Sequence, residues 1–330
     1  MKKIISLMLS LIMVLVLTVG CTNSNEEAKK EESTPSNIKV VTPAGTPTLS
    51  MIKMFKENPH IGDNISVSYE SVKSTDLLTS KILSKEADIF IVPTNLAANL
   101  YNKNSGYKIA TSTVWGTFYL VGNEKVSNWD DLKGKEIDMI GRGLTPDAIF
   151  RYLLIQNNID PDKDVKLNYF GGASELATNF ISGKSDLSLM PEPMLTKALT
   201  KRSDSRVLID LQKDWEKATK LNSSYPQASL IVSEELINNH PDAVKSFLGE
   251  YKKSVNWVNQ NPSEAGEYYE ELNMGLTKMI VEKSIKRCNI EYVSAKDAKE
   301  SIDKYLNVLF EYNSKLVGGK LVDEDFYFTK

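Results

Sequence analysis

The segment EIDMIGRGLTP, residues 136–146, follows the same plan as the earlier segment IKVVTPAGTP, residues 38–47. In each, a short, mainly apolar run ends at a glycine turn, and a Thr-Pro pair then opens a helical pattern. A second apolar run, a Ser-started amphipathic pattern and a last run ending in proline follow in both units. Short apolar runs that alternate with helical patterns predict parallel strands covered by helices on both faces.

The two units match at a constant offset of 98 residues. Equivalent positions are Gly45 and Gly143, Asp88 and Asp186, and Pro93 and Pro191. We therefore predict an α/β fold of two similar Rossmann-like lobes with mainly parallel sheets. The alternative is a chance similarity between two ordinary β-α-β units.

Two further apolar segments would connect these lobes. TSTVWGTFYLV, residues 111–121, has the composition of a long strand that leaves the first lobe, and YPQASLIV, residues 225–232, could return the chain to it. The pair predicts a two-strand hinge. Lobe 1 would comprise residues 38–113 and 230–330, and lobe 2 residues 114–229.

The C-terminal region shows helical periodicity. Apolar residues of 241–260 fall on one stripe, with Pro241 suited to the first turn. Ser294 precedes a second striped segment that includes Tyr305, and Asp297 completes a capping-box pattern. We assign both stripes to the core.

The N-terminus resembles an export signal. Lys2 and Lys3 precede an uncharged apolar run that ends at Gly20, and Leu17–Cys21 is similar to a bacterial lipobox, with Thr18 where leucine is usual. We predict a signal peptide at residues 1–20, acyl chains of the palmitate type on Cys21, and a disordered tether over 21–37, which contains nothing to bury. The alternative is an uncleaved anchor helix.

Composition excludes several other functions. The net charge of −3, with both signs interspersed, argues against a nucleic-acid partner. Cys288 is the only cysteine besides Cys21, so an intramolecular disulfide is not expected. The two histidines, His60 and His240, are isolated, and we therefore predict no metal, no cofactor, no catalytic residues and no enzyme activity.

Ligands of open α/β sheets bind beyond the carboxyl ends of the strands. The strand-to-helix loops there contain Thr46 and Pro47 in one unit and Arg142, Gly143 and Thr145 in the other. Glycines allow backbone N–H groups to approach a ligand, and a helix start favours an anionic or acceptor-rich group. The alternative for the Gly-Arg-Gly sequence is an ordinary turn.

The last strand of each unit leads into a second loop, with Thr94 and Asn95 in one unit and Glu192 between two prolines in the other. Glu192 could accept hydrogen bonds from an amine or amino-heterocycle, or it could be a solvated turn residue. Trp115 and Tyr225, near the crossings, could form a flat apolar wall, and Trp115 could instead pack in the hinge.

With these segments in place, residues 37–330 resemble the type II periplasmic binding proteins, in the nitrate, sulfonate and thiamine-pyrimidine-precursor branch. The resemblance is carried by DLKGKEI (131–137), the Gly-x-Gly-x-Thr-Pro helix start (141–146), RYLL (151–154), NIDPDKDV (158–165) and MPEP (190–193). By position, it places the family's binding loops on Thr46, Pro47, Thr94, Asn95, Trp115, Gly143, Thr145 and Glu192.

The resemblance implies a monomeric, lipid-anchored receptor on the extracytoplasmic face of the bacterial plasma membrane. Such a receptor closes on a small molecule and delivers it to an ABC permease and its ATPase. Arg142 suggests a sulfonate, whereas Glu192 and Trp115 favour an amino-heterocycle. A sensory receptor of the same fold is an alternative. So is a pyrimidine-biosynthesis enzyme, although the Cys-rich motif of that branch is absent.

Overall fold

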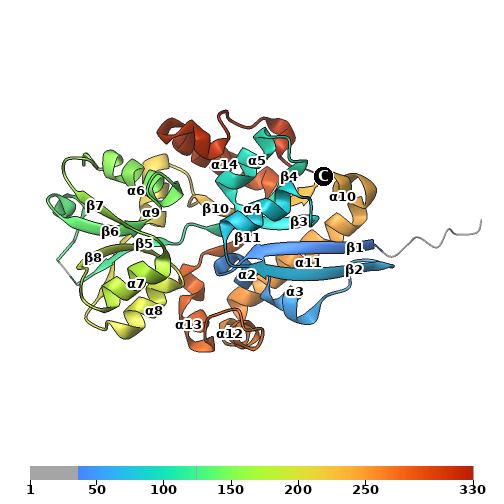
Figure 1. The fold of residues 1–330 in the computed structure, drawn as a ribbon, viewed down its shortest axis with the longest axis horizontal. Coiled ribbons are helices and arrows are strands. Elements are labelled where there is room, and N and C mark those ends of the chain that lie inside the picture. The colour runs from blue at the N-terminus through green and yellow to red at the C-terminus, as the bar shows by residue number, and fades with distance from the viewer. Residues whose placement is uncertain (1–35, 124, 330) are drawn as a thin grey trace, which may run out of the picture. The chain divides into compact units, whose positions relative to one another are not determined.

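The computed structural model describes residues 36–123 and 125–329, which form two separate β-sheets covered by helices (Figure 1). The signal peptide, Cys21 and most of the predicted tether lie outside the described residues. The six-stranded sheet has the order β11-β4-β10-β3-β1-β2, and the five-stranded sheet has the order β7-β6-β8-β5-β9. The strands are β1 (Ser36–Pro43), β2 (Ile65–Val72), β3 (Ile89–Pro93), β4 (Tyr107–Trp115), β5 (Phe118–Gly122), β6 (Glu136–Ile140), β7 (Lys166–Phe170), β8 (Leu187–Pro191), β9 (Arg206–Asp210), β10 (Pro226–Ser233) and β11 (Ile290–Ser294).

The helices connect and flank these strands. They are α2 (Thr46–Ser50), α3 (Ile52–Glu57), α4 (Thr75–Leu83), α5 (Thr94–Asn102), α6 (Thr145–Gln156), α7 (Ala173–Ile181), α8 (Met194–Lys201), α9 (Leu211–Thr219), α10 (Glu234–Asn239), α11 (Pro241–Gln260), α12 (Pro262–Glu271), α13 (Lys278–Ser284) and α14 (Ala295–Tyr312). Short 3-10 helices are η1 (Trp129–Leu132), η2 (Ile285–Arg287), η3 (Ser314–Val317) and η4 (Glu324–Phe326). No described helix is long and apolar enough to cross a membrane.

The predicted duplication is confirmed by the strand order. β1 pairs in parallel with β2 and β3, and β6 pairs in parallel with β7 and β8. Antiparallel strands complete each sheet. They are β10, β4 and β11 in the six-stranded sheet, and β5 and β9 in the five-stranded sheet. Both sheets are therefore mixed, and their parallel strands are those of the repeat.

The first crossing differs from its prediction as one continuous strand. β4 ends at Trp115 and β5 begins at Phe118, so the chain changes sheets within Gly116 and Thr117. Gly116 has φ +45°, and a Cβ there would lie 2.6 Å from the Ser224 hydroxyl oxygen. A strand cannot continue through this left-handed conformation, which the apolar character of the flanking residues conceals. The return runs from α9 into β10, close to the predicted position.

Strand ends also differ by a few residues from the predicted boundaries. β1 begins at Ser36 rather than after residue 37, because its backbone pairs with β2 from Ser36 opposite Ile65. The six-stranded sheet includes Trp115 and begins again at Pro226, so the crossings lie slightly inside the predicted lobe 2. The division into two separately moving lobes stays a prediction.

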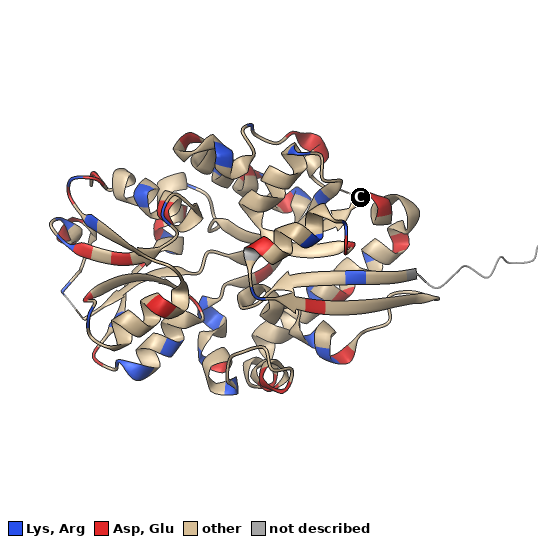
Figure 2. Ribbon diagram, viewed as in Figure 1, with Lys and Arg blue, Asp and Glu red and all other residues tan. Residues whose placement is uncertain are grey.

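Helices cover both faces of each sheet through distinct apolar clusters. On the six-stranded sheet, α2, α3 and α11 pack on one face and α4, α5 and α14 on the other. On the five-stranded sheet, α6 and α9 share one cluster, and α7 and α8 pack in another. The cluster of α6, α9 and α14 also joins the two sheets, since it contains Phe150, Trp215 and Tyr305. Lys, Arg, Asp and Glu are distributed over the helices of both sheets (Figure 2).

The helix starts follow sequence rules with two exceptions. α11 begins at Pro241 as predicted, and the Ser294 hydroxyl caps α14 by accepting from Asp297 N–H. α7 has Gly172 at its N-cap and not the serine that the pattern predicted, since that serine, Ser174, lies within the helix. The predicted loop after β3 is absent, because Thr94 and Asn95 already form the first turn of α5 with Pro93 at the N-cap.

Candidate ligand-binding cleft

Two cavities meet where the carboxyl ends of the parallel strands of one sheet face those of the other. The proline slot, of about 370 Å³, is bordered by Pro43 and Pro47 after β1, Pro93 after β3, and Pro146 in α6. The glutamate pocket, of about 350 Å³, is bordered by residues after β1 and β8. Pro47 and Gln227 line both cavities. Together the cavities form one cleft of a size typical for small-molecule sites.

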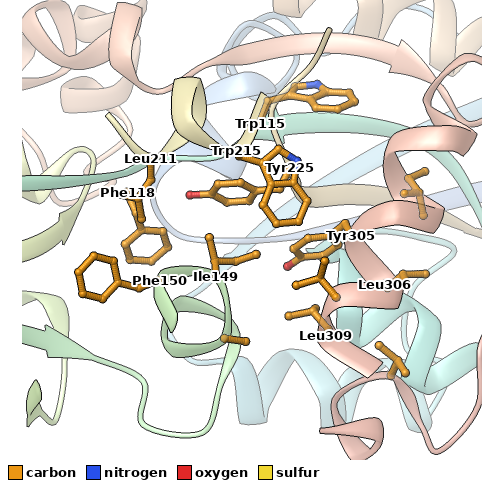
Figure 3. Packing of buried hydrophobic residues seen from close by; sticks show 14 of the residues in the cluster. Trp115, Phe118, Ile149, Phe150, Leu211, Trp215, Tyr225, Tyr305, Leu306 and Leu309 are labelled. Carbon is orange, nitrogen blue, oxygen red and sulfur yellow. The ribbon is translucent and has the colours of Figure 1, made fainter. Parts of the chain in front are cut away.

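The proline slot is mainly apolar. Besides the four prolines, Phe118 from the five-stranded sheet and Tyr305 from α14 border it. Its polar lining consists of Asn95, Thr145 and Gln227. Tyr305 stacks on Tyr225 with ring centroids 6.2 Å apart and an interplanar angle of 13°, and Phe118 lies across from these rings (Figure 3). The slot therefore offers flat walls and neutral hydrogen-bonding groups.

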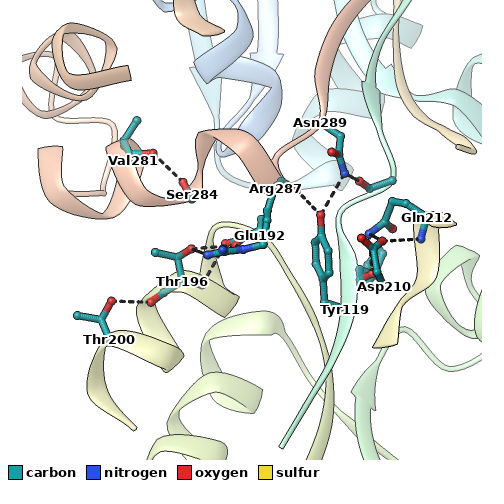
Figure 4. A network of polar contacts seen from close by, with 12 residues as sticks. Tyr119, Glu192, Thr196, Thr200, Asp210, Gln212, Val281, Ser284, Arg287 and Asn289 are labelled. Atoms are coloured by element: carbon teal, nitrogen blue, oxygen red, sulfur yellow. Dashed lines mark hydrogen bonds and ion pairs between the residues drawn. The ribbon is translucent and has the colours of Figure 1, made fainter. Parts of the chain in front are cut away.

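The glutamate pocket contains one carboxylate, and that carboxylate already has partners. Glu192 Oε1 accepts from Arg287 Nε at 2.5 Å and from the Thr196 hydroxyl at 2.8 Å, and Thr196 N–H donates to Oε2 at 3.0 Å (Figure 4). Burial raises the pKa of Glu192, while the Arg287 charge and the hydrogen bonds lower it. Arg287 belongs to η2 and Glu192 follows β8, so this ion pair connects elements of the two sheets.

The backbone donors that the sequence predicted to be free are largely occupied. Gly45 N–H donates to the Tyr269 hydroxyl at 3.1 Å, and Gly143 N–H donates to Asp147 Oδ2 at 2.8 Å. Asp147, in the first turn of α6, thus supplies a negative charge at the positive end of that helix. This carboxylate makes the start of α6 a poor site for an anion.

Gln227 has the most distinctive environment in the cleft. Its side-chain oxygen accepts from Thr117 N–H at 2.9 Å and from the Thr117 hydroxyl at 3.1 Å. A backbone N–H can only donate, so these contacts fix which end of the amide is oxygen. The NH₂ group faces away from Thr117, and Gln227 borders both cavities.

The predicted site residues are divided between the cleft and other places. Those that line the cleft are Thr46, Pro47, Asn95, Thr145 and Glu192. Thr94 and Tyr225 are fully buried behind it, where the Thr94 hydroxyl lies 2.7 Å from that of Ser229 and the Tyr225 hydroxyl donates to Gln212. As ligand contacts, all of these residues stay predictions.

Three other predicted residues border different cavities. Arg142 and Gly143 line one of about 590 Å³, in which the Arg142 guanidinium lies 4.6 Å from the centroid of the Tyr169 ring. Trp115 borders another of about 820 Å³, and its ring N–H donates to the Glu291 carbonyl at 3.1 Å. Neither the Arg142 nor the Trp115 side chain borders the cleft, because Arg142 packs on Tyr169 and Trp115 donates to the Glu291 carbonyl.

Sequence reasoning missed Gln227, Tyr305, Phe118, Tyr269 and Arg287. A glutamine inside the apolar segment YPQASLIV was an available indication, since an interior strand rarely carries an unexplained amide. Tyr305 was assigned to the core, and it does pack there as well as bordering the slot. The described residues contain no group of His, Cys, Asp and Glu side chains that could hold a metal ion.

Two mixed sheets of duplicated topology, joined by two crossings around a cleft, form the fold of the type II periplasmic binding proteins. The NMT1/THI5-like family model matches residues 105–265. The crystal structure of an ABC transporter protein from Parabacteroides distasonis is 30% identical, covers 89% of this chain and 99% of its own chain, and has a TM-score of 0.77. The chain therefore belongs to the same family as this ABC transporter protein, and its residues 105–265 are NMT1/THI5-like.

Two further proteins are similar to this chain at lower identity. The periplasmic aliphatic sulphonate binding protein SsuA of Escherichia coli shares the fold, with a TM-score of 0.69 over 90% of this chain and 92% of its own, at 13% identity. YtlA of Bacillus subtilis, described as a binding protein, is 23% identical over 211 residues. That match spans 62% of this chain and 59% of YtlA.

Proposed function

We propose that the protein is a lipid-anchored receptor on the extracytoplasmic face of the plasma membrane, which captures a small organic molecule for an ABC permease and its ATPase. The anchor would be the acylated Cys21. The observation that carries the proposal is the cleft, because both sheets contribute to its walls. Its named relatives are binding proteins rather than enzymes.

Capture would proceed by closure of two lobes about the crossings at Gly116–Thr117 and before β10. A ligand in the proline slot touches Asn95 from one lobe and Thr145 from the other, so it gains most contacts when the lobes are closed. A ligand shifts such an equilibrium by the difference between its affinities for the two states. Micromolar binding corresponds to about −8 kcal/mol, which a few hydrogen bonds and one apolar wall can supply.

Capture can be tested by incubating the purified protein with a small-molecule extract of bacterial cells, followed by native mass spectrometry and identification of what is retained. We expect a stoichiometric, chemically unchanged ligand, whose affinity is then measured by calorimetry. If the protein retains no small molecule from extracts or from a broad compound library, the proposed function is wrong.

A matched pair of variants tests the location. The Asn95 side-chain NH₂ donates to the Leu316 carbonyl and that of Asn99 to the Lys315 carbonyl, at 3.2 and 2.9 Å, but only Asn95 borders the slot. Asn95→Ala and Asn99→Ala should therefore have similar costs in stability. Only Asn95→Ala should weaken ligand binding, by several-fold. Equal affinities of the two variants would place the ligand elsewhere.

A further inference from the structure

The charge of the cleft lining restricts the ligand. Among the described residues that line the proline slot and the glutamate pocket there is no Lys, Arg or His. The carboxylate present, Glu192, is paired with Arg287, and the start of α6 is already matched with Asp147. Burial of an anion needs a cation or several convergent donors, which this lining does not provide. An organic cation would face a Glu192 whose charge is already neutralised.

Gln227 offers a specific neutral contact instead. Thr117 holds its amide oxygen through two hydrogen bonds, and its NH₂ group makes no hydrogen bond among the described residues. Because Gln227 borders both cavities, this donor lies where the two parts of the cleft meet. A pre-oriented donor beside an apolar wall suits a hydrogen-bond acceptor attached to a ring or other apolar group.

Tyr305 closes the slot on the side of α14. Its side chain is fully buried and borders the slot, with its hydroxyl directed to the α6 side (Figure 3). The hydroxyl oxygen is buried as well, so Tyr305 supports the wall of the slot and offers no accessible polar group to a ligand.

We propose that the cleft selects an uncharged, ring-containing molecule whose carbonyl oxygen or ring nitrogen accepts a hydrogen bond from the Gln227 side-chain NH₂ group. The ring lies in the proline slot against Phe118 and the prolines of the slot. This inference rests on the proposed function and specifies its substrate class. Gln227 would orient the acceptor, and the absence of Lys, Arg and His from the described lining would select against sulfonates and carboxylates, because these would bury an unpaired charge.

The test uses matched pairs of probes on the same ring, measured with the full chain by thermal shift and then calorimetry. The pairs are benzamide and benzoate, nicotinamide and nicotinate, and benzenesulfonamide and benzenesulfonate. At millimolar concentration, we expect a neutral member to raise Tm by about 2 °C or more. The anionic partner should raise it less. A larger shift with the anionic members, or no shift with any neutral member, overturns the inference.

Variants connect the effect to Gln227. Gln227→Glu keeps oxygens for Thr117 but loses the NH₂ donor, so it should weaken the neutral probe about tenfold. The control Tyr107→Phe removes a buried hydroxyl, which donates to the Ala87 carbonyl outside the cleft, and it should lower Tm and leave affinity unchanged. Unchanged affinity of Gln227→Glu overturns the inference.

The result also distinguishes this inference from the proposed function. A chain that binds an anionic ligand in the cleft remains a solute receptor, and only the selection for an uncharged ligand is then wrong. A chain that binds neither the probes nor any molecule from the cell extract lacks the proposed function itself.

Discussion

The ion pair between Glu192 and Arg287 gives a prediction whose magnitude depends on pH. Arg287→Met would leave the Glu192 carboxylate, whose side chain is 0% exposed, without its cation. Removing one partner of a buried pair costs about 3–5 kcal/mol. The Arg287 side chain is 36% exposed and both Thr196 hydrogen bonds remain, so water and Thr196 offset part of this cost. We therefore expect a loss of about 2 kcal/mol near neutral pH.

The loss of stability caused by Arg287→Met should be smaller at acidic pH. Burial raises the pKa of Glu192 in the folded protein. The folded state therefore takes up a proton more readily than the unfolded state, and stability from this group falls as the pH rises through the folded pKa. Without Arg287 that pKa rises further, so the destabilisation grows with pH above about 4.3, the ordinary value for glutamate.

Urea unfolding of wild type and Arg287→Met, followed by circular dichroism near pH 4.5 and near pH 7.5, measures this difference. The double variant Glu192→Gln/Arg287→Met should recover to within about 1 kcal/mol of wild type, because a neutral amide no longer needs the cation. A destabilisation of equal size at both pH values, or none at either, would refute this account of the pair.

Substitutions at Gly116 and Asp147 and chemical labelling of Cys288 test other parts of the structure. Gly116→Ala should lower the free energy of unfolding by about 3 kcal/mol or more, because its Cβ would lie within 2.8 Å of Ser224, Gln212 and Tyr225. Gly134→Ala is the control: Gly134 also has a positive φ, +78°, but has open space around it, so the loss measured by urea unfolding should be only about 1 kcal/mol. Asp147→Asn should lower the free energy of unfolding by about 2 kcal/mol in the same assay. The Asp147 carboxylate accepts hydrogen bonds from Gly143 N–H, Arg151, Tyr169 and Tyr312, and an unchanged free energy of unfolding would contradict this network. Burial raises the pKa of the Cys288 thiol to about 12, so peptide mapping should find it unmodified by iodoacetamide near pH 8 until urea is added, and rapid native labelling would show that it is accessible.

The duplicated units could be predicted because local rules act within each of them. An apolar run, a glycine turn and a Thr-Pro helix start carry their information within about ten residues, and the same order recurs at Gly45 and Gly143. The break at Gly116 could not be predicted in this way. The residues that leave no room for a side chain at this left-handed position are Ser224, Gln212 and Tyr225, which are distant in sequence.

The site was only partly predictable for the same reason. Loops at strand ends pointed to Thr46, Pro47 and Thr145, which the fold brings into one cleft. The pairing of Glu192 with Arg287 joins residues 95 positions apart, and no spacing rule predicts it. Arg142 was expected near a ligand from its loop alone, but its side chain stacks on Tyr169 and borders another cavity.

Tyr305 illustrates a further limit of sequence patterns. A helical stripe predicts which residues face inward, and Tyr305 does face inward. The pattern carries no information on whether the inward side also borders a cavity. That depends on how α14 packs against α6 and the crossing strands, which only the three-dimensional structure shows.

Small-angle X-ray scattering of the purified protein, with and without the molecule that it captures from cell extract, tests the receptor account most directly. If the walls of the cleft belong to two lobes that close on a ligand, the radius of gyration should fall on saturation, and Asn95→Ala should require more ligand for the same change. An unchanged radius of gyration at saturating ligand would contradict closure.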